Sequence, residues 1–85
     1  MKKDVYEIIK FSWSYNSQRE NKYIGTIDEL RNIVELKRLL QNKKPRTING
    51  LKKILDKYAR EQTSIYTGIT YDVYKHYGEY KIGLQ

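Results

Sequence analysis

Cysteine is absent from the 85 residues of this chain, and its absence excludes disulfide bonds, thiolate nucleophiles and cysteine-based zinc sites. The fold must therefore be held by packing alone, which is compatible with a reducing cytosol. The sequence also lacks any apolar run of the length that a signal peptide or a membrane span needs. We expect a protein that stays in the cytoplasm where it is made and does not enter a membrane.

Side chains that commonly carry catalysis are scarce as well. His76 is the single histidine, and Asp72 lies four residues before it, but no triad spacing or metal-ligand spacing accompanies the two. The five glycines are scattered and form no phosphate-binding loop. The sequence therefore predicts a binding protein, not an enzyme, with neither a metal nor a cofactor.

Acidic residues are outnumbered by basic ones, 10 to 17, which gives a formal net charge of +7. Such a balance favours polyanionic partners through long-range attraction and counterion release. The other interpretation is solubility, because lysine-rich compositions also arise in proteins from AT-rich genomes. Hydrophobic content of 39%, with nine Tyr, one Trp and one Phe, is enough for one folded domain over residues 1–85.

The N-terminal segment alternates with the period of a strand. Large apolar side chains occupy odd positions such as Ile9, Phe11 and Trp13, while serine and lysine occupy even ones, so we expect a half-buried strand with its odd residues inward. A helix also fits part of this segment, but aromatic and β-branched residues favour the strand. Residues 16–21 are polar and read as a connection.

A capping box marks the start of a helix at Thr26, because the Thr26 hydroxyl can accept the backbone N–H of Glu29 while that carboxylate bonds back. Apolar residues spaced for one helical face continue to Leu40. Lys37 falls inside this face. Either its stem packs with the ammonium reaching water, or the helix breaks near Glu35.

A second helix follows Pro45, with Thr47 as its N-cap and an end near Gln62. Its narrow apolar stripe consists of Ile48, Leu51, Ile54, Leu55 and Tyr58.

In the C-terminal part, apolar and polar residues again alternate with the period of a strand. A strand is predicted from Ile65, with Ile69, Tyr71 and Val73 on one face, and residues 77–79 form a turn into a last strand over residues 80–84. The order is β-α-α-β-β. We expect an α+β fold, a small and mostly antiparallel sheet with two helices packed on one face.

Positive charge is concentrated between Lys43 and Arg60, where seven basic residues face one acid, Asp56. On a helical wheel, part of this set lies opposite the apolar stripe and should face solvent, where it would bind an acidic protein surface or a nucleic acid. An ordinary solvated face is the alternative. The predicted binding residues of this basic set are Lys43, Lys44, Arg46, Lys53, Lys57 and Arg60.

Two helices joined by a short linker, the second one basic, also resemble a helix-turn-helix pattern. A recognition helix needs polar side chains near its N-terminus to read base edges, and only Thr47 and Asn49 are available there. Binding dominated by the phosphate backbone fits this sequence better than base reading.

Tyrosines near the C-terminus form a second candidate surface, because tyrosine combines a large apolar body with a polar end. Tyr66, Tyr74, Tyr77 and Tyr80 could form such a surface around the C-terminal strands, although core packing explains several of them equally well. We predict Tyr66 and Tyr74 as binding residues and place Tyr58 and Tyr71 in the core. The same surface could pair two copies in a homodimer.

The stretch from Tyr23 to Val34, together with the strand pattern of residues 6–15, resembles segments of small accessory proteins from bacteriophages and mobile elements of low-GC Gram-positive bacteria. The resemblance implies a virus-encoded accessory protein, a group that includes anti-CRISPR inhibitors of Cas nucleases. The first hypothesis is therefore a stoichiometric inhibitor that engages a Cas nuclease or its ribonucleoprotein through the basic residues. The alternative is a regulator that binds DNA or RNA.

Overall fold

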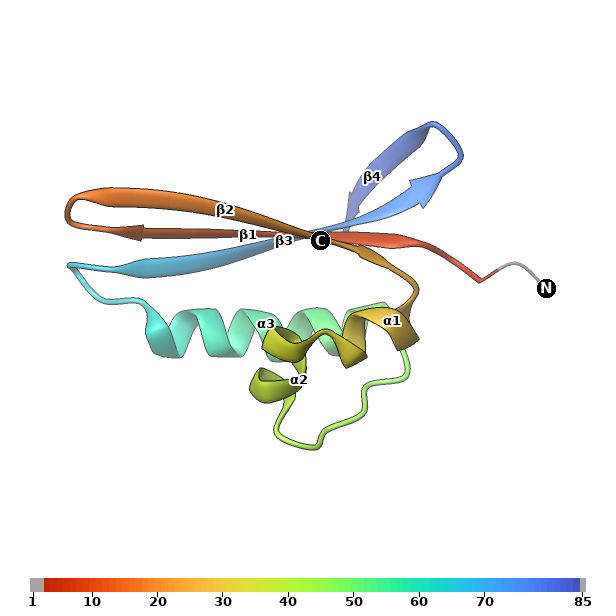
Figure 1. Ribbon diagram of the computed structural model, residues 1–85, viewed down its shortest axis with the longest axis horizontal. Coiled ribbons are helices and arrows are strands. Elements are labelled where there is room, and N and C mark those ends of the chain that lie inside the picture. Colours follow the sequence, from red (N-terminus) through yellow and green to blue (C-terminus); the bar gives the residue numbers. More distant parts are fainter. Residues whose placement is uncertain (1–2, 85) are drawn as a thin grey trace.

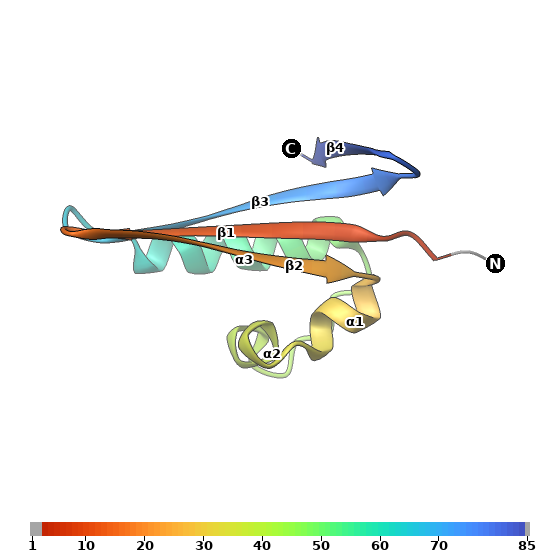
Figure 2. The same ribbon diagram turned by 45° about the horizontal axis from the view of Figure 1, so that its top comes forward.

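The computed structural model describes residues 3–84, which form one four-stranded antiparallel sheet and three helices (Figure 1). The strand order is β2-β1-β3-β4, and all three helices lie on the same side of the sheet (Figure 2). The predicted α+β architecture, a small sheet with helices on one face, is confirmed. The elements are β1 Tyr6–Ser14, β2 Ser17–Gly25, α1 Ile27–Asn32, α2 Val34–Leu40, α3 Ile48–Gln62, β3 Gly68–Tyr77 and β4 Tyr80–Leu84.

The predicted connection over residues 16–21 was wrong, because most of it belongs to β2. Ser14 pairs with Ser17, so that Tyr15 and Asn16 alone form the turn between β1 and β2. Side chains from Ser17 to Lys22 are exposed. Backbone pairing to β1 holds this edge strand, and a strand that buries few side chains leaves no hydrophobic period in the sequence.

The prediction of which β1 residues face the core was also wrong. The even residues Tyr6 and Ile8 pack into the core beneath the sheet, whereas the odd residues point to the side that no helix covers. Phe11 and Trp13 are 37% and 39% exposed there. Both faces of β1 carry large apolar side chains. The alternating pattern therefore predicted a strand correctly but did not identify which face packs into the core.

The capping box at Thr26 is confirmed. The Glu29 N–H donates to Thr26 Oγ1 at 3.3 Å, and the Thr26 N–H donates to Glu29 Oε1 at 3.0 Å. The helix then stops at Ile33, whose extended backbone (φ −65°, ψ 129°) separates α1 from α2. Because the helix breaks, Lys37 does not lie inside one long apolar face. Its side chain is exposed on α2.

The prediction for α3 is confirmed at both ends. Thr47 Oγ1 accepts the Gly50 N–H at 3.1 Å, and the helix ends at Gln62. Leu51 and Leu55 are fully buried against the sheet. None of the helices within residues 3–84 combines the length and apolar character needed to cross a membrane. The core that α3 helps to form consists of Ile8, Leu30, Leu36, Leu40, Leu51, Leu55, Ala59, Tyr71 and Val73.

Strand β3 begins at Gly68, three residues later than predicted, and Ile65 is 89% exposed before it. The predicted turn after Tyr77 is confirmed, and Gly78 supplies the positive φ of 62° that this tight hairpin uses. Strand β4 pairs only with Val73–Tyr77. The other half of β3, Gly68–Asp72, has β1 on one side and no strand on its other side within residues 3–84.

Candidate functional site

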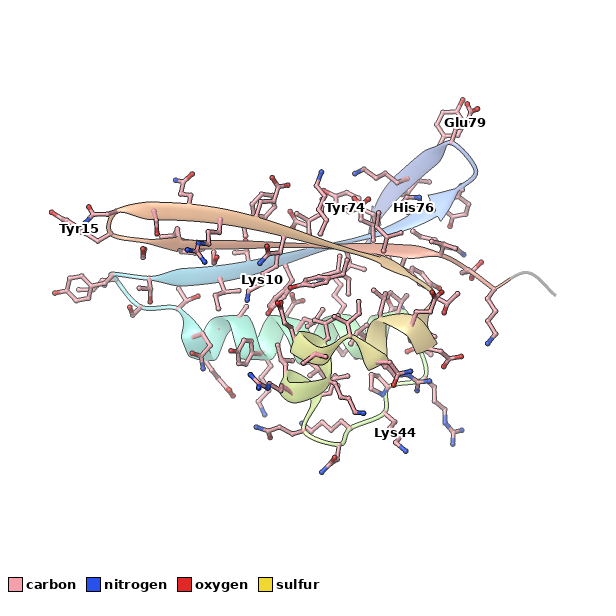
Figure 3. All side chains as sticks on the ribbon, in the orientation of Figure 1. Lys10, Tyr15, Lys44, Tyr74, His76 and Glu79 are labelled. Carbon is pink, nitrogen blue, oxygen red and sulfur yellow. The ribbon has the colours of Figure 1, made fainter. Side chains whose placement is uncertain are left out.

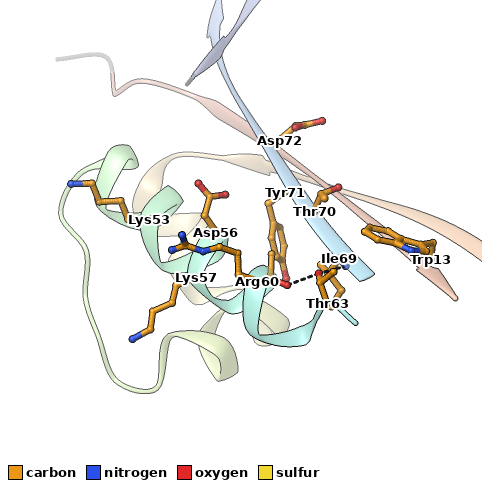
Figure 4. Close-up of a pocket in the computed structure, with 11 residues that line it drawn as sticks. Trp13, Lys53, Asp56, Lys57, Arg60, Thr63, Ile69, Thr70, Tyr71 and Asp72 are labelled. Carbon is orange, nitrogen blue, oxygen red and sulfur yellow. Dashed lines mark hydrogen bonds between the residues drawn. The ribbon is translucent and has the colours of Figure 1, made fainter. Parts of the chain in front are cut away.

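An open groove of about 990 Å³ runs between α3 and this unpaired half of β3 (Figure 4). We call Gly68–Asp72 the β3 edge, because no strand covers its outer side among the described residues. The groove is lined by Trp13, Lys53, Asp56, Lys57, Ala59, Arg60, Thr63, Ile69, Thr70, Tyr71 and Asp72.

Three cations of α3, namely Lys53, Lys57 and Arg60, line one side of the groove, and we call them the α3 cations. Their spacing of four and three residues places them on one flank of the helix. All three are exposed, and none forms an ion pair with an acid of residues 3–84. Their charge is therefore available to a partner.

The acids in the groove do not neutralise the α3 cations. Asp56 accepts a hydrogen bond from Lys52 Nζ at 2.7 Å, so its charge is already matched on the same helix. Asp72 occupies a β3 position whose side chain lies on the face of the sheet away from α3, because its neighbours Tyr71 and Val73 are the buried ones. The helix side of the groove is thus predominantly positive.

The opposite side of the groove is apolar and aromatic. The Trp13 indole lies across Gly68, where an added Cβ would come within 1.8 Å of the ring, and Ile69 is half-buried beside it. Burial raises the pKa of Tyr71 to about 12, so its hydroxyl stays protonated at neutral pH. The groove therefore combines a sheet wall that is mostly apolar and aromatic, with one acid, Asp72, and a cationic wall on α3.

The cations of the α2–α3 loop do not all join the groove. Lys43 lines a separate, smaller hollow of about 170 Å³ together with Lys57 and the acid Glu61. Lys44 projects from the part of the loop far from the sheet (Figure 3). Arg46 lines a different hollow beside Asp28 and Arg31. The structure brings three of the six predicted basic residues together in the groove, places Lys43 next to Lys57 in the adjoining hollow, and leaves Lys44 and Arg46 apart.

The two predicted binding tyrosines lie far from each other. Tyr66 is 66% exposed in the segment before β3, whereas Tyr74 lies on the uncovered face of the sheet near the β4 hairpin (Figure 3). Lys81 Nζ stands 4.9 Å from the Tyr74 ring centroid, so that ring already has a cation partner within the molecule. One continuous tyrosine surface does not form.

The single histidine belongs to a small charged cluster on the uncovered face. Glu7 is buried, with its carboxylate 2.7 Å from Lys81 Nζ and 3.6 Å from His76 Nε2. The hydrogen bond from Lys81 lowers the pKa of Glu7 below its ordinary value and raises that of Lys81. This pair ties β1 to β4 and stabilises the hairpin. Within residues 3–84, no three acidic or histidine side chains are arranged to hold a metal ion.

The structure weakens the helix-turn-helix alternative, because one of the two residues that could contact base edges has another role. The Thr47 hydroxyl is bonded to the Gly50 N–H as the cap of α3, so capping occupies the side chain that would have to contact a base. Asn49, which is exposed, is the other candidate.

Sequence reasoning missed the sheet side of the groove, above all Trp13 and the β3 edge. One signal was present, because an isolated glycine inside a strand pattern often marks a close approach by another group. Gly68 is such a glycine, and Trp13 is the group that approaches it.

Comparisons of the chain with protein-family models, with curated proteins and with solved structures found no match.

Proposed function

We propose that the protein acts by stoichiometric, non-enzymatic binding, and that the α3 cations dock onto an acidic surface of a partner protein. The observation that carries this proposal is the set of three exposed cations along one groove, none of which pairs with an acid of residues 3–84. Charges left unpaired beside an apolar wall suit a partner that supplies both carboxylates and apolar contacts.

The partner we propose is a host defence nuclease of the Cas type, or its ribonucleoprotein, in the cytoplasm of a low-GC Gram-positive bacterium. The resemblance of Tyr23–Val34 to phage accessory proteins supports this choice. Inhibition of this kind needs a rigid surface, and α3 is anchored by the buried Leu51 and Leu55 directly behind the α3 cations. A capped helix on a packed core provides such a surface.

A second candidate is a regulator that binds the backbone of DNA or RNA. Lys43 favours it, because this residue lies near Lys57 in a hollow that Glu61 also lines, and a phosphate backbone benefits from cations beyond the groove. Such binding releases counterions and weakens steeply with salt.

Co-elution and cleavage assays with a guide-loaded Cas nuclease, alongside a naked 20-base-pair duplex, separate the two candidates. We expect the protein to bind the loaded nuclease and to stop cleavage at a stoichiometric ratio. Binding to the naked duplex alone, with a steep salt dependence, would support the regulator and overturn the inhibitor. Failure to bind either one would overturn both candidates.

A further inference from the structure

We propose that the groove accepts an extended acidic segment of the partner as an additional strand, paired to the β3 edge and held by the α3 cations. This inference rests on the proposed function, because it specifies the chemistry of the partner that the α3 cations would meet.

The direction of the β3 backbone groups follows from its pairing with β1. The His76 N–H donates to Val5 O at 2.9 Å, so even residues of β3 bond to β1, and odd residues direct their N–H and C=O groups to the other side. Beyond the part covered by β4, the odd residues are Ile69 and Tyr71.

The bonding groups of these two residues decide whether a strand can pair here. Thr63 Oγ1 accepts the Ile69 N–H at 3.4 Å. The Ile69 C=O and both groups of Tyr71 have no strand partner among the described residues. A donor and two acceptors therefore stand in line along the edge, and another polypeptide backbone has the complementary groups at the same spacing.

Besides the β3 edge, the sheet has outer edges at β2 and at β4, and the β2 edge is protected by charge. Strand β2 carries Arg19, Glu20 and Lys22 along its outer edge, which is how natural proteins discourage pairing. The β3 edge carries one charged residue, Asp72, at its last position. Trp13 is 39% exposed at the opposite end. Strand β4 carries one charged residue, Lys81, but only the β3 edge lies beside the α3 cations.

The charge of the α3 cations indicates which kind of molecule would bind along the β3 edge. A second copy of the chain would bring its own α3 cations against the first set, and like charges would repel. A phosphodiester backbone offers acceptors but no donor for the Ile69 and Tyr71 carbonyls. An acidic polypeptide satisfies both requirements, because its backbone pairs with the edge and its carboxylates meet Lys53, Lys57 and Arg60.

Successive side chains of a strand point to opposite faces, and this alternation predicts the sequence pattern of the bound segment. Side chains on the helix side of an added strand face the α3 cations and should be Asp or Glu. Side chains on the other side lie over the face that carries Trp13, Thr70 and Asp72, and those next to Trp13 should be apolar. The β3 edge of five residues spans about 17 Å at the rise of an antiparallel strand. A segment of five to seven alternating residues would fill it.

A capped peptide of seven alternating valines and glutamates, beginning and ending with valine, tests this inference on the full-length protein. Trp13 is the only tryptophan, so its emission reports occupation of the groove. Amide hydrogen exchange reports the pairing itself. We expect the Tyr71 N–H to become protected, while the Lys22 N–H at the outer edge of β2 continues to exchange as in the free protein.

Two N-methylated peptides provide matched controls, because the added methyl groups remove hydrogen-bond donors without changing charge. In an antiparallel pair the glutamate amides face β3, so we expect N-methylation of the glutamates to weaken binding at least about tenfold. N-methylation of the valines should leave binding nearly unchanged. Equal effects of the two methylated peptides would overturn the strand pairing.

The variant K53E/K57E/R60E distinguishes failure of this inference from failure of the proposed function. If the peptide binds, the variant loses that binding, and the Tyr71 N–H gains no protection, then strand pairing is wrong and the α3 cations still dock acidic chains. If the wild-type protein binds neither the peptide nor poly-L-glutamate, both proposals are overturned.

Discussion

The indole of Trp13 covers Gly68 on the neighbouring strand, and a Cβ placed on Gly68 would meet the ring at 1.8 Å. The contact joins β1 to the first residue of β3 at the open end of the groove. A side chain at position 68 would occupy the space that the ring now fills. This glycine is therefore a packing requirement of the sheet and of the groove beside it.

Gly68→Ala should destabilise the protein by roughly 1 to 3 kcal/mol, because inserting a methyl group into a filled site forces the ring to move. Urea unfolding followed by circular dichroism measures the change, and Trp13 emission should shift to the red as the ring becomes more exposed. Gly83→Ala is the matched control, since its Cβ would lie 3.5 Å from Tyr74, an ordinary contact. A Gly68→Ala protein as stable as wild type, with unchanged emission, would contradict this packing.

Leu51→Ala and Leu55→Ala should each cost roughly 2 to 5 kcal/mol of the free energy of unfolding, because both leucines are fully buried and truncation leaves a cavity. Chemical denaturation measures the loss. Leu51→Met, which conserves volume, keeps the test informative if the alanine variants do not fold, and should cost less than about 1.5 kcal/mol. Equal stability of Leu51→Ala and wild type would show that α3 does not pack on the sheet in this way.

Local signals in the sequence predicted the helices well. The caps at Thr26 and Thr47 involve only residues three positions apart, so neighbouring side chains fix them. Strand β2 was missed because it is polar along most of its length and is held by backbone bonds to β1, which depend on residues distant in sequence. The inner face of β1 was misassigned because Phe11 and Trp13 remain on the side that no helix covers.

Only half of the candidate site was predictable from the sequence. The α3 cations could be found from helical spacing, since the buried stripe of α3 fixes which flank they occupy. The other wall depends on the pairing of β3 with β1 and on the approach of Trp13 to Gly68, which join residues distant in sequence. Arg46 and Tyr74 were grouped with the site because they are near it in sequence or in residue type, and the fold separates them.

Acidification should reduce stability partly through Glu7. Its pKa is lowered in the folded protein by the Lys81 hydrogen bond, so its contribution is present above the ordinary glutamate pKa of about 4.5 and is lost as the pH falls toward the lower folded value. Glu7→Gln should therefore flatten the decline of unfolding free energy below about pH 4.5. Denaturation at a series of pH values from neutral to acidic measures both slopes.

Some acid dependence should survive in Glu7→Gln, because Asp28, bonded by Lys3, and Glu29, bonded by Thr26, also have lowered pKa values. Identical slopes for Glu7→Gln and wild type would contradict the role assigned to the Lys81 pair.

The proposed docking surface is tested most directly by comparing two variants that reverse the same number of cations at different positions on the protein. K53E/K57E/R60E reverses the α3 cations, and R19E/K22E/K37E reverses three exposed cations outside the groove. The two variants carry the same net charge, so any effect of overall charge is equal in both.

Binding of each variant to poly-L-glutamate, measured by isothermal titration calorimetry at fixed ionic strength after circular dichroism has confirmed folding, gives the decisive comparison. We expect K53E/K57E/R60E to lose binding and R19E/K22E/K37E to keep most of it. Equal losses in the two variants, or binding retained by a folded K53E/K57E/R60E protein, would contradict the assignment of the docking surface to the α3 cations.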